Sequence, residues 1–216
     1  MGKEAGIQHI LVINPNSSES ITAQIHDAVA DGEAVQVVTS RHGPPAIESD
    51  ADVVAAVAPM LHLARRQSAD ALVVACFSDP GLEALRAQSR VPAFGIAESA
   101  VHRALELGDS VGIISSVDDS LPRHRRYWAK LGVVDRVVDD IALGLGVLEL
   151  NTDEAFDRAL QAGRDLVSAG ADVVVLGCTG MTHMQGSLQR SLGVPVVDPC
   201  LAAVQDARDS LEAAPA

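Results

Sequence analysis

The chain has 216 residues, and its 16 Lys and Arg against 29 Asp and Glu give a formal net charge of −13 at pH 7. This negative field repels nucleic-acid phosphates and anionic lipid headgroups, so we expect neither nucleic acid nor membrane as a partner. Hydrophobic residues make up 48% of the chain but aromatic residues only 2%, too few for base-stacking platforms. The composition therefore predicts a folded globular protein whose ligand is small and polar.

Targeting signals are not expected in this sequence. No run of about 18 apolar residues could span a bilayer, and Met1-Gly2-Lys3-Glu4 leads into a strand-like segment instead of an apolar signal region. Three cysteines are an odd number for a disulfide framework, and a reducing compartment would keep them as thiols. We therefore expect a cytoplasmic protein.

Short β-branched runs alternate with longer amphipathic stretches along the whole chain, which is typical of parallel sheets covered by helices. The expected strands are residues 8–13, 34–39, 71–76, 92–96, 111–116, 134–141, 173–178 and 194–197. The expected helices are residues 17–31, 50–67, 80–88, 97–107, 120–131, 153–169, 183–191 and 200–212. Asp79-Pro80 has the pattern of an N-cap followed by proline at the first helical position. The sequence thus predicts an α/β fold.

Two stretches of the chain resemble each other. Residues 68–76 and 170–178 each place an Asp six positions before a terminal Cys. Asn14 precedes the first of these cysteines by 62 residues, and Ser116 precedes the second by 62. A short Val-Pro strand start follows both segments. This repetition predicts two copies of one α/β unit, which would be related by a pseudo-twofold axis.

The predicted halves are residues 1–97 and 98–199, and each carries one cysteine at the carboxyl end of a strand. In open parallel sheets, ligands bind beyond these strand ends. The duplication would bring Cys76 and Cys178 to equivalent positions, so we expect the two thiols to face each other across a cleft between the domains. Cys200 has no counterpart in the repeat, and we interpret it as a structural residue.

Two facing thiols suit the inversion of a carbon stereocentre, because this reaction needs a base on one face and an acid on the other. A thiol titrates near enough to neutrality for one partner to be thiolate. Helix N-termini after each cysteine should lower the thiol pKa and offer amide donors to an enolate. Asp79 would oppose thiolate formation unless its carboxylate is turned onto helix amides. The plainer alternative is a pair of buried structural cysteines, which the matched placement disfavours.

Five segments, residues 13–18, 75–81, 92–98, 176–181 and 194–199, closely resemble the hydantoin racemase branch of the aspartate/glutamate/hydantoin racemase superfamily. The resemblance implies a cofactor-independent, two-base racemase with Cys76 and Cys178 as the proton-transfer pair. It also implies two pseudo-symmetric α/β domains, with the C-terminal helix at 200–216 packed on the first. Substrates in this branch are 5-substituted hydantoins or allantoin. We also expect a homo-oligomer.

The resemblance and the flanks of the two cysteines supply the expected substrate contacts. These are Asn14, Ser17, Ile47, Phe77, Ser78, Asp79, Ser115, Ser116, Thr179, Gly180 and Met181. Some of them have simpler interpretations, because Asn14-Pro15-Asn16 is also ordinary turn chemistry. Likewise, residues 43–48 around Ile47 are compatible with a plain proline-rich loop. The hydroxyls of Ser115 and Ser116 are expected to bind a ring carbonyl or a carboxylate.

Other charged and glycine-rich segments have plainer explanations. We expect His183 and the basic cluster at residues 123–126 to be solvated, although an Arg that reached the cleft would indicate an anionic substrate. Cys178 and His183 form one isolated pair, so no metal site is expected. The loop at residues 143–147 lacks the third glycine of a dinucleotide fingerprint.

Three functional hypotheses are compatible with the sequence. The leading one is racemisation of hydantoins or allantoin through Cys76 and Cys178. A second keeps the fold but changes the substrate to a small carboxylate, with amino acid racemase, maleate isomerase-like or arylmalonate decarboxylase-like chemistry. A third is a binder of small molecules without activity, or a redox sensor with an exposed thiol of low pKa.

Overall fold

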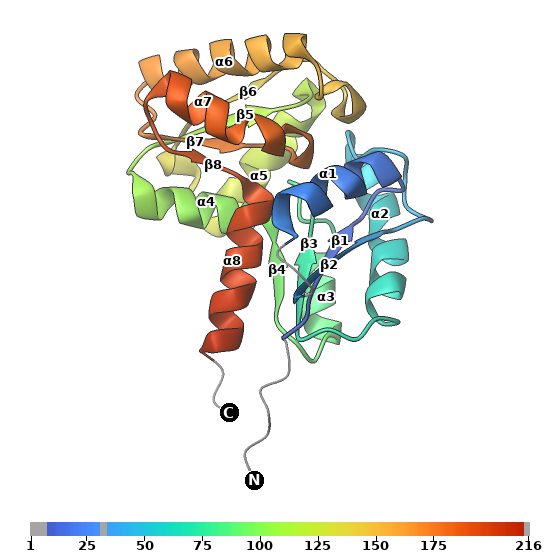
Figure 1. Ribbon diagram of the computed structural model, residues 1–216. Coiled ribbons are helices and arrows are strands. Elements are labelled where there is room, and N and C mark those ends of the chain that lie inside the picture. The colour runs from blue at the N-terminus through green and yellow to red at the C-terminus, as the bar shows by residue number, and fades with distance from the viewer. Residues whose placement is uncertain (1–7, 31–33, 214–216) are drawn as a thin grey trace.

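A computed structural model describes residues 8–30 and 34–213 of the chain. Two four-stranded sheets, with strand orders β2-β1-β3-β4 and β6-β5-β7-β8, make up its β structure. Every strand pairing within them is parallel. Helices flank both sheets (Figure 1). The predicted fold of two pseudo-symmetric α/β halves is confirmed. None of the helices within the described part of the chain is long and apolar enough to cross a membrane.

The elements alternate in the order expected from the sequence. The strands are β1 (Ile10–Asn14), β2 (Val35–Thr39), β3 (Ala71–Val74), β4 (Ala93–Gly95), β5 (Val111–Ser115), β6 (Val137–Ala142), β7 (Val173–Leu176) and β8 (Val196–Val197). The α-helices are α1 (Glu19–Val29), α2 (Asp50–Ala64), α3 (Leu82–Gln88), α4 (Ile96–Leu107), α5 (Leu121–Leu131), α6 (Asp153–Ser168), α7 (Gln185–Leu192) and α8 (Pro199–Glu212). Short 3₁₀ helices include η2 (Asp118–Ser120), η3 (Val134–Arg136), η4 (Val147–Glu149) and η5 (Thr179–Met184).

Both faces of the first sheet are covered, which explains why its strands are continuously apolar. In β1, Ile10 and Val12 join one hydrophobic core, and Leu11 and Ile13 join another on the opposite face. This is the alternation that a strand imposes on successive side chains. The first core is continuous with residues of the second sheet and of α4 and α8. The two halves therefore share one apolar interior.

The backbone confirms that the two halves repeat. The amide of Ala75 donates to the carbonyl of Ile13 over 2.9 Å, and the amide of Gly177 donates to that of Ile114 over 2.7 Å. These matching bonds make Asn14 equivalent to Ser115. The predicted match of Asn14 with Ser116 is thus wrong by one residue, because the second half has one extra residue between its first strand and its cysteine.

Helix α8 runs from the second half back to the first (Figure 1). It packs against α1 and α4 and against strands β1, β3 and β4. Cys200, near its start, is fully buried in the shared core. The domain limits stay a prediction, and their outermost residues, 1–7 and 214–216, lie outside the described part of the chain, as does residue 31 of the first predicted helix.

One error in the predicted elements concerns the start of α3. The Asp79-Pro80 pattern predicts a helix from residue 80, but α3 begins at Leu82 with Gly81 as its N-cap. Gly81 has a φ of +68° and Asp79 a φ of +43°. Both lie in the left-handed region, which breaks the helical path at this point. A smaller error is that the strand expected from residue 134 begins at Val137, after η3.

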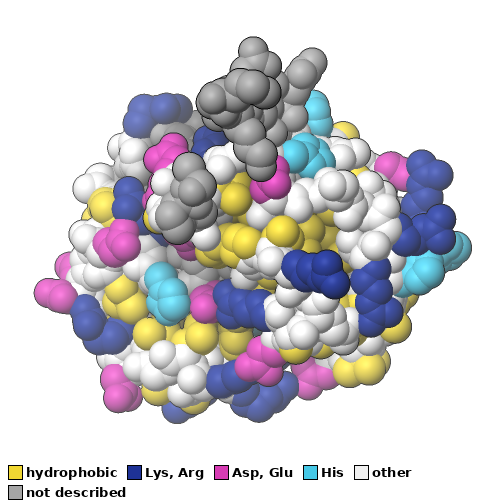
Figure 2. Space-filling model, turned by 90° about the horizontal axis from the view of Figure 1, so that it is seen from below, with side chains coloured by type: hydrophobic (Ala, Val, Ile, Leu, Met, Phe, Trp, Pro, Cys, Tyr) yellow, Lys and Arg dark blue, Asp and Glu magenta, His cyan; other side chains and the backbone are white. Residues whose placement is uncertain are grey.

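The face at the bottom of Figure 1 has mixed charge. Figure 2 shows Lys and Arg side chains interspersed there with Asp and Glu side chains and with small hydrophobic patches. Phosphate backbones bind along continuous basic stripes. The described side chains of this face therefore form no continuous basic stripe.

Candidate active site

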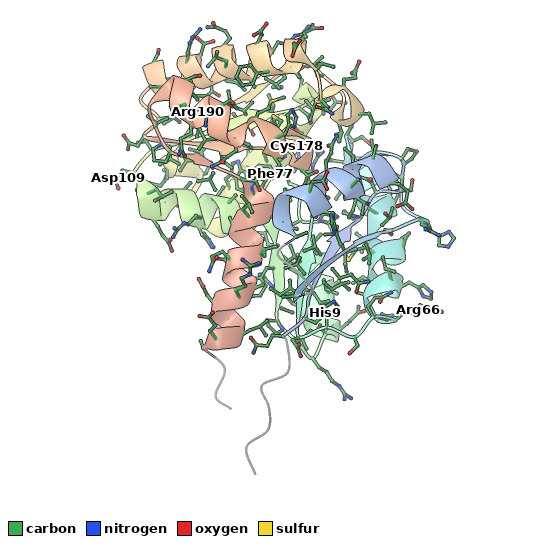
Figure 3. All side chains as sticks on the ribbon, in the orientation of Figure 1. His9, Arg66, Phe77, Asp109, Cys178 and Arg190 are labelled. Carbon is green, nitrogen blue, oxygen red and sulfur yellow. The ribbon has the colours of Figure 1, made fainter. Side chains whose placement is uncertain are left out.

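The two cysteines of the repeat line one cavity. Cys76 lies two residues after the end of β3, and Cys178 lies two residues after the end of β7. Figure 3 shows Cys178 and Phe77 at the junction between the two halves of the molecule. The cavity is lined by Asn16, Ile47, Ala75, Cys76, Phe77, Ser78, Ser116, Ser120, Arg123, His124, Val147, Gly177, Cys178 and Thr179. It thus lies where two sets of parallel strand ends meet, as ligand sites in such sheets do.

Cys76 is a partly buried thiol on the side of the cavity that the first half of the chain provides. Burial raises its pKa to about 12, and the charges of Cys178 and Asp79 act in the same direction. The backbone N–H of Ser78 and the guanidinium of Arg123 favour the thiolate. Desolvation is the largest of these effects, so the thiol form dominates at neutral pH.

Cys178 is 7% exposed and has a similar environment. Burial raises its pKa to about 11, although the backbone N–H of Gly180 and the hydroxyl of Thr179 favour the thiolate. The expectation that helix N-termini lower both pKa values is therefore wrong in its net effect. The amide donors are present beside each sulfur, but the loss of hydration outweighs them.

Asp79 is turned away from the cavity and onto another helix. Its carboxylate accepts hydrogen bonds from the amides of Ala97 and Glu98, over 3.0 and 2.9 Å, and from the Tyr127 hydroxyl over 2.9 Å. Burial raises its pKa to about 7 despite these donors. A Cβ at Gly95 would lie 2.2 Å from the carboxylate carbon, so only glycine leaves room for it. Asp79 thus closes the N-terminus of α4 and does not line the cavity.

The loop after β1 reaches the cavity through a different residue from the one predicted. Asn14 is fully buried, and its side-chain amide donates to Asn16 Oδ1 over 2.9 Å and to Thr22 Oγ1 over 3.0 Å. Ser17 donates to the carbonyl of Pro44. Neither residue lines the cavity, whereas Asn16 does. Asn14 and Ser17 therefore shape the loop that presents Asn16.

The paired serines after β5 have separate roles. Ser116 lines the cavity. Ser115 is fully buried and donates to Asp140 over 2.5 Å, with His124 Nδ1 at 3.2 Å from its hydroxyl. His124 Nδ1 also lies 2.9 Å from the other oxygen of Asp140. Ser115 thus belongs to a buried network behind the cavity wall.

The remaining predicted contacts divide in the same way. Ile47, Phe77, Ser78 and Thr179 line the cavity. Gly180 does not line it, but its amide faces the Cys178 sulfur. Met181 is fully buried in the apolar core, so it packs η5 instead of lining the cavity.

Among the residues of the cavity wall that sequence reasoning missed are two from the basic cluster. Arg123 and His124 were expected on a solvated face, but both line the cavity, and their side chains are only 11% and 3% exposed. The rest of the basic cluster fits the expectation better, since the Arg126 side chain is 61% exposed. His183 is exposed and lies outside the cavity. Helical spacing is the signal that could have found them, because Ser120, Arg123 and His124 share one face of α5.

Comparison with known proteins agrees with this architecture. The family model of the Asp/Glu/hydantoin racemases matches residues 10–207. The chain belongs to this family. A hydantoin racemase of Paenarthrobacter aurescens is 36% identical over 209 residues, which cover 90% of this chain and 87% of that one. The family and the class of enzyme, a racemase, are as the sequence predicts.

Solved structures give the same result. The allantoin racemase from Pseudomonas fluorescens superposes with a TM-score of 0.88 at 29% identity, over 95% of this chain and 91% of that one. The allantoin racemase from Klebsiella pneumoniae gives a TM-score of 0.86 at 30% identity, over 95% and 88%. The family members with this fold therefore include enzymes named for both hydantoin and allantoin.

Proposed function

We propose that this racemase inverts C5 of 5-substituted hydantoins or of allantoin without a cofactor, using Cys76 and Cys178 as its two bases. The observation that carries the proposal is the pair of thiols at equivalent strand ends on one cavity. The hydantoin and allantoin racemases to which the chain is similar support the substrate class.

The reaction needs one proton removed and one returned. A thiolate on one side takes the C5 proton, and the C–H electron pair passes into the adjacent ring carbonyl to form an enolate. The thiol on the other side then gives its S–H proton to the opposite face of C5. The product has inverted configuration, and the two sulfurs have exchanged their protonation states, so no external acid or base is consumed.

Amide donors beside each sulfur fit this chemistry. The N–H groups of Ser78 and Gly180 face the sulfurs of Cys76 and Cys178 respectively. They stabilise whichever sulfur carries the negative charge at a given step. Because burial raises both thiol pKa values, each thiolate is a stronger base than an exposed one, which helps it to remove a weakly acidic C–H proton.

Substrate entry requires movement of the cavity walls. The free volume of the cavity is about 30 Å³, whereas sites for small organic ligands usually have about 300 Å³ or more. We propose that the two halves move apart to admit the substrate and close around it. Closure would exclude water from the enolate.

The alternative functions are less well supported. A redox-sensing cysteine is normally exposed and has a lowered pKa, whereas burial raises the pKa of both thiols here. Alkylation distinguishes the racemase from the redox sensor. Substrate should protect both thiols of a racemase from alkylation, whereas a sensor should be alkylated at one thiol whether or not substrate is present. We further propose a cytoplasmic homo-oligomer. The three free thiols support a reducing compartment, and sedimentation would measure the assembly.

The test follows enantiopure 5-benzylhydantoin, 5-isobutylhydantoin and allantoin by circular dichroism in D₂O. The wild-type enzyme should remove the signal faster than buffer alone and introduce deuterium at C5. Cys76→Ser and Cys178→Ser should each abolish racemisation, while each still exchanges the C5 proton of one hand, and the two variants should choose opposite hands. Cys200→Ala is the matched control, because it removes a buried thiol that does not line the cavity. This variant should racemise the substrate at the wild-type rate. Racemisation at the wild-type rate by both serine variants would overturn the mechanism.

A further inference from the structure

We propose that the C5 substituent of the substrate carries a carboxylate, which Arg123 binds. This inference rests on the proposed racemase function and names its substrate class. The hydantoins concerned are those of acidic amino acids, with a carboxymethyl or carboxyethyl group at C5. An aromatic group would leave the Arg123 donors without an acceptor, and an uncharged ureido group could accept from them but would not balance their charge.

Arg123 is a buried cation in the cavity wall. Its side chain is 11% exposed, its Nε donates to Ser78 Oγ over 2.9 Å, and its Nη1 donates to Asp50 Oδ1 over 3.1 Å. A guanidinium has five N–H donors in a planar fork that suits a carboxylate. The two bonds to Ser78 and Asp50 hold the fork in place and leave donors for a ligand.

The charge of Arg123 is only partly compensated. Asp50 is the carboxylate beside it, and this group also accepts from Arg126 Nη2 over 2.8 Å. One carboxylate thus serves two guanidinium groups. Asp50 is also 65% exposed, so water screens it, whereas the guanidinium of Arg123 is shielded. Asp52 is a second carboxylate near Arg123; hydrogen bonds from Ser49 lower its pKa most, and the guanidinium lowers it further. Its hydrogen bonds, however, are to Glu48 and Ser49. The Arg123 guanidinium therefore still presents N–H donors and its positive charge to the cavity.

His124 supplies a second polar atom on the same helical turn. Asp140 and Ser115 hold its Nδ1 from behind, at 2.9 and 3.2 Å. Because the Asp140 carboxylate can only accept when ionised, the proton of a neutral ring lies on Nδ1, and Nε2 keeps a lone pair that cannot donate to a carboxylate. His124 therefore shapes the cavity wall beside Arg123 and does not itself bind the anion. Phe77 packs edge-on against the ring, with centroids 5.3 Å apart. The imidazole is thus fixed in orientation by three neighbours.

A carboxylate, Glu48, acts on the Cys178 side of the cavity without lining it. Glu48 raises the pKa of Cys178, whereas Arg123 lowers that of Cys76. The Glu48 carboxylate accepts from the amide of Val147 over 2.8 Å. An anionic substituent is therefore attracted to the Arg123 side and repelled from the Glu48 side. This difference would orient the ring between the two sulfurs.

The experiment compares two substrates of nearly equal shape, enantiopure 5-(2-carboxyethyl)hydantoin and its primary amide. We expect the wild-type enzyme to racemise the acid with a higher kcat/KM than the amide. In Arg123→Gln, the ratio of the two values should fall by about ten- to a hundredfold, the usual size for loss of a hydrogen bond to a charged group. Arg123→Lys keeps the charge without the fork and should restore part of the ratio.

Arg125→Gln is the matched control, because Arg125 lies on the same helix but is exposed and does not line the cavity. Its acid-to-amide ratio should equal that of the wild type. A wild-type enzyme that racemises the amide as well as the acid would refute the carboxylate inference and leave the racemase proposal intact, as would an unchanged ratio in Arg123→Gln. An enzyme that racemises neither these nor the neutral hydantoins would refute both.

Discussion

Replacing Asp79 by alanine should destabilise the protein, with an unusual dependence on pH. The substitution removes the acceptor for two α4 amides and leaves the Tyr127 hydroxyl without its partner. Loss of a helix cap costs about 0.5–2 kcal/mol, and an unpaired polar group costs about 1–3 kcal/mol. We therefore expect a loss of about 2–4 kcal/mol in the free energy of unfolding at pH 4.5.

The sign of the pH effect follows from the raised pKa of Asp79. Its pKa is about 7 in the folded protein, against an ordinary value of 3.8 for an exposed Asp. The folded state therefore holds this proton more tightly than the unfolded state. The contribution of Asp79 to stability is complete below the unfolded value and is lost as the pH rises from about 4 to 7. The cost of Asp79→Ala should thus shrink between pH 4.5 and pH 7.5.

Urea denaturation at both pH values measures this difference. Effects of other titrating groups cancel, because they are shared by the wild type and the variant. Asp157→Ala, an exposed substitution on α6, is the control and should stay within about 0.5 kcal/mol of the wild type at either pH. A cost that grows from pH 4.5 to pH 7.5 would refute the reasoning, since that is the behaviour of an ordinary cap with a low pKa.

Two further predictions concern the thiols and the glycine beside Asp79. Because burial raises the pKa of Cys76 to about 12 and that of Cys178 to about 11, kcat/KM for an N3-methylated hydantoin should rise about tenfold per pH unit from 7 to 9, after subtraction of the buffer rate. A plateau below pH 8 would contradict the raised values. Gly95→Ala should cost about 1–3 kcal/mol in urea denaturation, because its Cβ would meet the carboxylate of Asp79. In a background of Asp79→Ala that cost should largely disappear, and a fully additive double variant would argue against the clash.

The strands and the thiol pair could be predicted because local patterns determine them. Strands buried on both faces are continuously apolar, and the repeat places each cysteine at the same distance beyond its strand. The start of α3 could not be predicted in this way. Asp79 has the sequence pattern of a cap for its own helix, but its carboxylate closes α4, whose bonded amides lie 18 and 19 residues later. Only the packed fold brings these groups together.

Helical spacing could place Arg123 and His124 on one face of their helix, but it could not show that this face lines the cavity. A run of charged residues on a helix is usually solvated, and this is true of Arg126. His124 is buried because Asp140, on β6, provides a partner for its Nδ1, and the pairing of β5 with β6 sets that contact. The thiol pKa values depend in the same way on the sum of burial over the whole cavity. The nearby helix N-termini, taken alone, predict lowered thiol pKa values, whereas burial raises both.

The duplicated halves give this enzyme two equivalent sulfurs in unequal surroundings. Arg123 lies on the Cys76 side and Glu48 on the Cys178 side. Racemisation nevertheless has an equilibrium constant of one, because the two hands of the substrate have the same free energy in water. The values of kcat/KM for the two hands must therefore be equal, and unequal surroundings can alter only how each is divided between kcat and KM. Arg123→Gln should accordingly lower kcat/KM for both hands of the acid by the same factor, even though it removes a charge from one side of the cavity.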